Sequence, residues 1–212
     1  MKALGMIEVY SFTAAICVAD IAAKTADVRV IAMDRNRPIS PDVPAPLVMI
    51  VKIEGEVAAV RSAVDAGVEY AKSKGKYIIS HIIANPGEDV EKMAYLLDLN
   101  KDKFSKNMPK NFLNNEIPEI QEHGAYGIIE ISGLVAAIEA SDTMLKTAQV
   151  RLIHTEKRLG GRLVTIIITG SVSAVKAAVE AGEAAAKPLG GVYGAEVIAS
   201  PHDEIAKFFS IG

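Results

Sequence analysis

The side chains best suited to acid–base or metal chemistry are thinly spread along this chain of 212 residues. The histidines include no i, i+4 pair and no HExxH motif, so their spacing does not support a zinc site. They are His81, His123, His154 and His202. No GxSxG, P-loop or GxGxxG motif occurs. We therefore predict that the protein is not an enzyme and has neither a metal site nor a cofactor.

Two pairs of acidic residues recur at matching places in the chain. Glu8 and Glu130 each lie in an apolar segment with strand character, where burial can perturb a carboxyl group. Their recurrence favours pairing with a backbone or lysine partner over catalysis. Asp20 and Asp142 recur in helical segments, and we expect them to face solvent or a subunit contact. Cys17 is the single cysteine, and a buried or half-buried small hydrophobic residue is its favoured interpretation.

The composition argues against several classes of partner. With 23 Lys and Arg against 26 Asp and Glu, the net charge of −3 provides no basic surplus for nucleic acid. No apolar stretch reaches the roughly 18 residues of a membrane span, and the first residues lack the cleavage site of a signal peptide. A lone cysteine suits a reducing compartment. We predict a soluble, cytoplasmic protein that binds neither nucleic acid nor membrane.

The chain contains an internal repeat. Residues 3–36 match residues 125–158 without a gap at an offset of 122, and 14 of the 34 pairs are identical. From Glu54 and Thr169 onward the offset falls to 115, so the first copy has seven more residues, located between Asn36 and Glu54. A repeat of this length indicates two similar domains.

In each copy, the spacing of apolar residues predicts the same order of strands and helices, β-α-β-β-α-β. In the second copy the strands are expected at 126–131, 150–156, 162–170 and 192–200, and the helices at 133–148 and from Val172. This order predicts two α+β, ferredoxin-like domains, each an antiparallel sheet with two helices on one face. The expected boundaries are 1–97 and 124–212, joined by a polar connector at 98–123. Continuous apolar runs at 47–51 and 166–168 predict that the second face of each sheet is also partly covered, by the other copy or another subunit.

Three segments of the second copy resemble the signature segments of bacterial microcompartment shell proteins. They are GLVAAIEASD (133–142), EKRLGGRLVT (156–165) and GSVSAVKAAVEAG (170–182), and the first copy matches more weakly in the same order. The resemblance is to the tandem-domain type with unpermuted element order. It implies a homotrimer that forms a pseudohexameric tile and associates laterally with other shell proteins in a microcompartment shell. Whether two tiles stack face to face is left open.

The resemblance also implies that the turns between the second and third strands line an axial pore for small metabolites. The matching residues are Arg35, Asn36, Arg37, Pro38, Ile39, Ser40, Pro41 and Asp42 in the first copy, and Arg158, Leu159, Gly160, Gly161 and Arg162 in the second. Four arginines against one aspartate would favour small anionic or polar metabolites. A plain hairpin at the two glycines and a proline-stiffened solvated loop remote from any axis are the alternatives.

Family tiles meet edge to edge through a lysine after the first helix, and Lys24 and Lys146 match that position. Without the resemblance, each would be interpreted as a solvated lysine at a helix end. Relatives often have an arginine before the proline of the last strand, where this chain has Asn85 and Ser200, so its edge packing is in doubt. No cysteine lies in either loop, so no axial iron–sulfur cluster is expected. The alternative function is a ferredoxin-like trimer that binds or senses metabolites in clefts between subunits.

Overall fold

The computed structural model describes residues 2–36, 38, 42–87, 124–156 and 163–205. The first copy consists of β1 (Ala3–Tyr10), α1 (Phe12–Thr25), β2 (Val28–Asn36), β3 (Val48–Gly55), α2 (Val57–Ser73) and β4 (Tyr77–Ile83). The second consists of β5 (Ala125–Ser132), α4 (Leu134–Thr147), β6 (Val150–Glu156), β7 (Leu163–Gly170), α5 (Val172–Ala186) and β8 (Val192–Ile198). The predicted element order and the α+β fold class are confirmed. The connector expected at 98–123 lies outside the described residues, so the domain boundaries stay a prediction.

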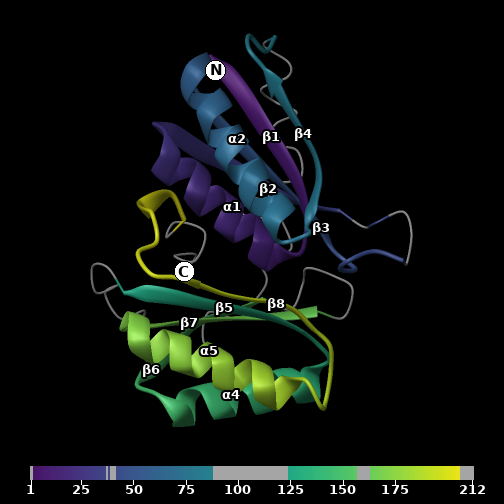
Figure 1. Cartoon of the computed structure of the whole chain (residues 1–212), viewed down its shortest axis with the longest axis vertical. Coiled ribbons are helices and arrows are strands. Elements are labelled where there is room, and N and C mark those ends of the chain that lie inside the picture. The colour runs from purple at the N-terminus through teal and green to yellow at the C-terminus, as the bar shows by residue number, and fades with distance from the viewer. Residues whose placement is uncertain (1, 37, 39–41, 88–123, 157–162, 206–212) are drawn as a thin grey trace, which may run out of the picture.

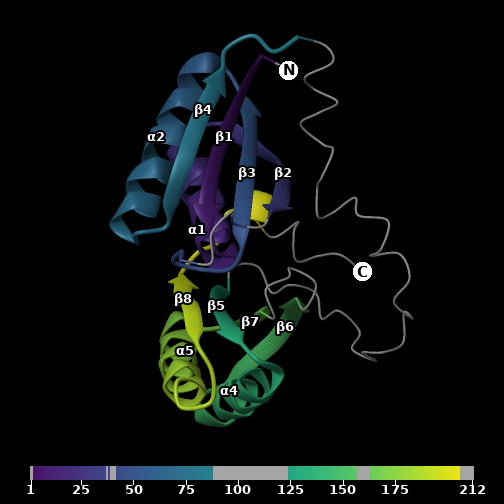
Figure 2. The same cartoon turned by 90° about the vertical axis from the view of Figure 1, so that its right-hand side faces the viewer.

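Each copy forms a four-stranded antiparallel sheet. The strand orders are β2-β3-β1-β4 and β6-β7-β5-β8, with the first strand of each copy in the centre. Both helices of a copy lie on the same face of its sheet (Figures 1 and 2). The registers also repeat, since Glu8 pairs with Ile50 and Glu130 with Thr165 at equivalent positions. The two copies therefore place matching sequence positions at matching places in the fold.

The sharp turn from the central strand into the first helix has the same backbone conformation in both copies. Gly133 adopts φ 93°, in the region that favours glycine, and its counterpart Ser11 adopts φ 79°. The Ser11 hydroxyl accepts a hydrogen bond from the backbone N–H of Ala14 at 3.2 Å. This N-cap offsets part of the cost of a positive φ at a residue with a Cβ.

The two copies share a hydrophobic core where the second sheet meets the first copy. Along β5, Ile129 and Ile131 pack beneath the helices of their own copy, whereas Tyr126 and Ile128 belong to the core of the first copy. In β7, Ile167 likewise faces the first copy. Helix α1 runs over β5 and β8, as both views show (Figures 1 and 2). The prediction that the second face of this sheet is covered is confirmed, and the first copy covers it.

The apolar periodicity of the helices has two outcomes. The spacing predicts one apolar face on each second helix, and its residues Val60, Val64, Val175 and Val179 are buried against their sheets. The first valines of the same faces, Val57 and Val172, are 36% and 38% exposed. In α4 the spacing correctly predicts a helix, but of the four apolar residues at turn spacing only Ala137 is buried. The other three are Leu134, Ile138 and Leu145, which are 54%, 61% and 45% exposed. The face of α4 toward its own sheet is built from small alanines and Met144, which leaves the larger side chains outward.

Candidate functional site

The predicted pore segments begin where β2 and β6 end. Arg35 and Asn36 are the last residues of β2 and pair with Met49 and Val48 at the start of β3. Arg35 is half-buried and Asn36 exposed, and further along Pro38 is half-buried and Asp42 exposed. The other predicted pore residues lie outside the described part of the chain: Arg37, Ile39, Ser40, Pro41, Arg158, Leu159, Gly160, Gly161 and Arg162. The pore therefore stays a prediction.

The end of the longer first-copy loop is anchored to the body of the domain. Ala45 and Leu47 are buried. The Leu47 carbonyl accepts a hydrogen bond from the Ser11 N–H at 2.9 Å, and the Pro44 carbonyl accepts one from the Lys76 ammonium at 3.3 Å. The loop thus returns beside the first residue before α1, which ties its position to the boundary between the copies.

A carboxylate of the second copy caps the first helix of the first copy. Glu130 in β5 is fully buried, and its two oxygens lie 3.3 Å from the backbone nitrogen of Phe12 and 3.5 Å from that of Thr13. These N–H groups belong to the first turn of α1, where a helix has no internal acceptors for them. A negative charge there is also favoured by the helix dipole. The predicted backbone pairing of Glu130 is confirmed.

The surroundings of Glu130 act on its pKa in opposite directions. Burial raises the pKa of this carboxyl, while the N–H groups of Phe12 and Thr13, the Ser11 hydroxyl and the Lys76 ammonium oppose that rise. Burial lowers the pKa of Lys76, and the nearby carboxylate of Glu130 opposes this. The Glu130 carboxyl group therefore has partners on several sides that hold it in place. This arrangement suits a structural cap between the copies.

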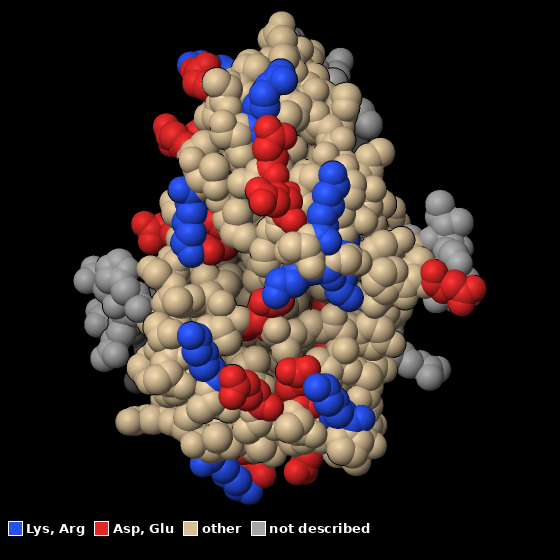
Figure 3. Space-filling view, in the orientation of Figure 1, with Lys and Arg blue, Asp and Glu red and all other residues tan. Residues whose placement is uncertain are grey.

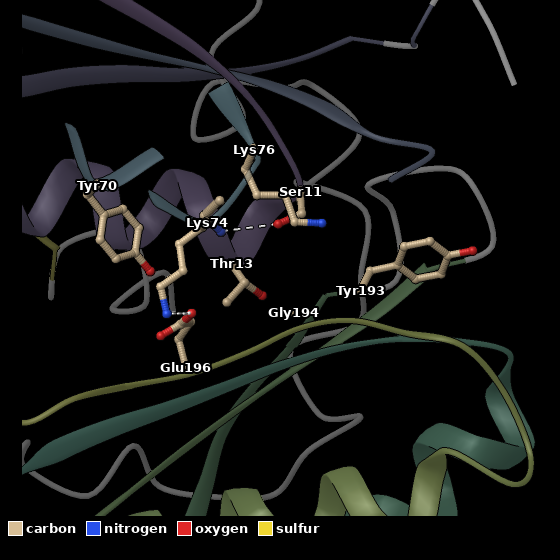
Figure 4. A pocket seen from close by; sticks show the side chains of 9 residues that line it. Ser11, Thr13, Tyr70, Lys74, Lys76, Tyr193, Gly194 and Glu196 are labelled. Carbon is tan, nitrogen blue, oxygen red and sulfur yellow. Dashed lines mark hydrogen bonds and ion pairs between the residues drawn. The ribbon is translucent and has the colours of Figure 1, made fainter. Parts of the chain in front are cut away.

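A cavity of about 170 Å³ lies beside this cap, between the two copies. Figure 4 shows Ser11, Thr13 and Lys76 on one side and Tyr193 and Gly194 on the other. At its far end the ammonium of Lys74 and the carboxylate of Glu196 form an ion pair at 2.6 Å. Thr13 Oγ1 is buried without a hydrogen-bond partner in the described part of the chain. The lining could hold a small polar molecule, but no nucleophile–base pair is formed among these residues.

The predicted edge lysines both pair with the recurring aspartates. Lys24 forms an i, i+4 ion pair with Asp20, and Lys146 forms one with Asp142 at 2.6 Å. The aspartates differ, because the side chain of Asp20 is 5% exposed and that of Asp142 is 52% exposed. The other two predicted edge residues, Asn85 and Ser200, are exposed. Their role at a tile edge stays a prediction.

The segment after β8 binds back to the first copy, which the sequence reasoning did not anticipate. The backbone N–H of His202 donates to Asp20 Oδ1 at 2.8 Å, and that of Val30 donates to Glu204 Oε2 at 2.6 Å. Asp20 therefore lies, with its side chain 5% exposed, in a contact between the two copies of one chain, whereas the sequence led us to expect solvent or a contact with another subunit. The sequence feature that could have indicated this contact is the aspartate that recurs at the same helical position in both copies.

The remaining candidates for chemistry are the metal-ligating side chains and the single cysteine. Within the described residues no cluster of histidine, cysteine, aspartate and glutamate could hold a metal ion. Cys17 is buried, as predicted, and burial raises the pKa of its thiol to about 12. The face in Figure 3 carries lysines and arginines interspersed with aspartates and glutamates. Among the described helices, none is long and apolar enough to cross a membrane.

Comparison with known proteins identifies the repeated unit. The model of the BMC domain matches residues 3–86 and 125–201. The bacterial microcompartment shell protein PduA of Citrobacter freundii is 49% identical over 88 residues, which are 42% of this chain and 94% of that protein. The shell protein EutM of Escherichia coli K12 is 48% identical over 88 residues, which are 42% of this chain and 90% of that protein.

Another relative extends over both copies. The carboxysome assembly protein CcmO of Synechococcus elongatus is 34% identical over 206 residues, which are 96% of this chain and 67% of that protein. Among solved structures, a microcompartment protein from Desulfitobacterium hafniense is 30% identical and covers 98% of this chain and 99% of its own, with a TM-score of 0.38.

Proposed function

This chain belongs to the BMC domain family, with two copies of the domain, and we propose that it is a shell component of a bacterial microcompartment in the cytoplasm. The observation that carries the proposal is the match of both copies to the domain, together with relatives that are named as shell or assembly proteins. The proposal makes the protein a structural component that associates with other shell proteins.

We propose further that three chains form a flat, pseudohexameric tile. Six domains would then surround one axis, because each chain contributes two. The exposed apolar side chains of α4 support such an assembly, since the related helix α1 is covered by the other copy of its own chain. Lys24 and Lys146, each beside an aspartate at the end of a first helix, would lie at the tile edges and contact neighbouring tiles.

The tile would have an axial pore lined by the two predicted pore segments. Its mouth would present Arg35 and Arg37 from the first copy and Arg158 and Arg162 from the second, which favours small anionic or polar metabolites. The anchoring of Pro44 and Leu47 beside α1 supports a fixed base for the longer loop.

Electron microscopy of the concentrated protein, together with native mass spectrometry, tests the tile. A three-chain species that associates laterally into sheets or closed shells is the expected result. Discrete trimers that never associate, even with other shell proteins present, would favour the alternative of a soluble metabolite-binding trimer. The cavity beside Glu130 could hold a small polar molecule, and it is the observation that supports this alternative.

The pore is tested by the double substitution Arg158→Glu with Arg162→Glu. We expect the assembled shell to become less permeable to small anions, because six glutamates would replace six arginines around the axis of one trimer. Permeability to a neutral solute of similar size is the control. An unchanged preference between anions and neutral solutes would contradict the pore assignment.

A further inference from the structure

The cavity between the two copies has no part in the proposed shell role. Its volume of about 170 Å³ corresponds to about five water molecules at roughly 30 Å³ each, or to one molecule of about six non-hydrogen atoms. The ion pair of Lys74 with Glu196 lies at one end of the cavity. These two side chains are 43% and 25% exposed, so a small solute can reach the cavity from solvent.

One wall of the cavity carries a buried hydroxyl group. Thr13 is 1% exposed, and its Oγ1 has no hydrogen-bond partner among the described residues. Figure 4 shows this hydroxyl directed toward Gly194 on the facing wall. An added Cβ at Gly194 would lie 3.0 Å from Thr13 Oγ1, so the glycine leaves the space in front of the hydroxyl open. Because a buried hydroxyl without a hydrogen bond is unfavourable, an oxygen of a ligand would be stabilised there.

A second hydrogen-bond donor lines the same cavity. Lys76 is partly buried, and burial lowers the pKa of its ammonium because water solvates the charge incompletely. The ammonium donates to the Pro44 carbonyl at 3.3 Å, which uses one of its three donors. This bond and the nearby Glu130 carboxylate hold the ammonium in place, so a ligand would not have to order it.

The charges around the cavity balance. Lys74 is paired with Glu196 at 2.6 Å, and Lys76 interacts with the Glu130 carboxylate. Glu130 also lies next to Thr13, since its Oε2 is 3.5 Å from the Thr13 backbone nitrogen. An anion beside Thr13 would therefore be repelled by Glu130, and a cation would be repelled by Lys76. Electrostatics favour a ligand without net charge.

The repeat shows that the fold does not require these polar side chains. In the first-copy wall, the counterparts of Ser11, Thr13, Tyr70, Lys74 and Lys76 are Gly133, Val135, Ala185, Leu189 and Gly191. In the facing wall, the counterparts of Tyr193, Gly194 and Glu196 are Ile78, Ile79 and His81. Both copies form the same helices and strands with either set of residues. The polar groups gathered around this one cavity therefore favour a binding role over a structural one.

We propose that the cavity binds a small uncharged molecule with an oxygen acceptor for Thr13 and Lys76 and an O–H or N–H donor for the Glu196 carboxylate. Short polyols and primary amides have this combination of groups. The site lies within one chain. It therefore goes beyond the proposed function and does not depend on assembly into a tile.

Saturation-transfer difference NMR on the full chain tests the site and the class of its ligand. Glycerol and acetamide are the uncharged probes, and acetate is the anion with the shape of acetamide. We expect saturable binding of both uncharged probes and at least about tenfold weaker binding of acetate, because Glu130 repels it. If neither uncharged probe shows saturable binding, the proposal is overturned. Tighter binding of acetate than of acetamide would overturn the assigned class.

Thr13→Val is the sharpest variant, because valine retains the shape of threonine and is the residue at the matching position, Val135. Loss of one hydrogen bond should weaken binding of both uncharged probes about tenfold. Thr165→Val is the matched control. Thr165 is also buried, and its hydroxyl likewise has no partner among the described residues, but it does not line the cavity. Equal binding by the two variants would contradict the site.

Lys76→Met tests the second donor. It should weaken binding by at least the same factor, because a charged donor forms the stronger hydrogen bond. Lys176→Met, at an exposed lysine of α5, removes the same charge elsewhere and should leave binding unchanged. Wild-type affinity in Lys76→Met would mean that this ammonium does not contact the ligand and would overturn the proposed pair of donors.

Melting temperature and assembly separate this site from the stability of the fold and from the tile. Without a probe, Thr13→Val should melt no lower than the wild type, because the described part of the folded chain gives the Thr13 hydroxyl no partner in place of water. A clearly lower melting temperature would mean that the hydroxyl is already bonded, which overturns the site. In electron microscopy, a chain that forms tiles but binds no uncharged probe overturns the site alone. A chain that binds the probes but never assembles supports the site and contradicts the tile.

Discussion

Helices α1 and α4 follow equivalent strands and have related sequences, yet their surroundings differ. Helix α1 is buried along most of its length, from Phe12 to Ala23. Helix α4 buries only Ala136, Ala137, Ala140 and Met144, which face its own domain. The difference arises because the second copy covers α1, whereas no described part of the chain covers the outer face of α4.

The same pattern of apolar residues in α1 and α4 serves two kinds of contact. The shared alanines on the inner side pack against the sheet in both copies. The outer side is apolar in both copies as well, with Ile16 and Ile138 at matching positions, but only one of them is buried within the chain. An apolar residue at such a position therefore indicates a partner without specifying whether it belongs to the same chain.

The largest expected effect comes from placing a charge at these matching positions. Ile16→Asp should lower the free energy of unfolding by more than about 4 kcal/mol, because it leaves an unpaired carboxylate in a closed core. Ile138→Asp should leave the circular dichroism spectrum native and raise the trimer dissociation constant more than about a hundredfold. Thermal denaturation and native mass spectrometry distinguish the two results.

The conservative substitution Ile138→Val is the control for that prediction, since it retains the apolar surface and should retain the trimer. If Ile138→Asp remains a trimer with unchanged affinity, α4 is not covered by another chain. If Ile16→Asp folds with native stability, the core between the copies is less closed than its burial implies.

A smaller effect is expected where the second helix of each copy crosses the first. Gly67 and Gly182 occupy equivalent positions, but an added Cβ at Gly67 would lie 2.8 Å from Ile7 Cδ1 and 3.0 Å from Val18 Cγ1. At Gly182 the added Cβ would lie closer still, 2.5 Å from Met144 Cγ and 2.6 Å from Met144 Sδ, and Met144 is fully buried. Gly67→Ala should therefore destabilise the protein by about 2 kcal/mol, and Gly182→Ala by about 3 kcal/mol. A smaller loss for Gly182→Ala than for Gly67→Ala in urea denaturation would contradict this order.

Much of the fold could be predicted from the sequence because the same spacing of apolar residues occurs twice, once in each copy of the repeat. Strand β6 coincides with its predicted range, and α4 differs from its prediction by one residue at each end. Burial could not be predicted in the same way. Periodicity distinguishes a helix from a strand, but Leu134 and Val60 have the same apolar character and opposite exposure.

The candidate site could be predicted only in part. The recurrence of Glu8 and Glu130 pointed to a pairing role, and the structure identifies the partners of Glu130 as the first N–H groups of α1. Sequence reasoning could not place Asp20 against the backbone of His202, because such a contact depends on how the two domains are oriented. Of the four arginines of the pore segments, only Arg35 lies in the described part of the chain, at the end of β2, so the pore has no equivalent test.

The smallest effect expected is the pH dependence that Glu130 gives to the contact between the copies. Burial raises the folded-state pKa of this carboxyl above its ordinary value of 4.5. The folded state therefore retains a proton that the unfolded state releases, and the stability due to this group falls as the pH rises from 4.5 through the folded-state pKa. Glu130→Gln should remove this contribution, so the difference in melting temperature between wild type and variant should change across that range. Lys76→Met should enlarge the change, because the Lys76 ammonium opposes the rise in the pKa of Glu130. A constant difference would contradict the raised pKa, and would mean that the hydrogen bonds to Glu130 and the Lys76 ammonium offset the effect of burial in full.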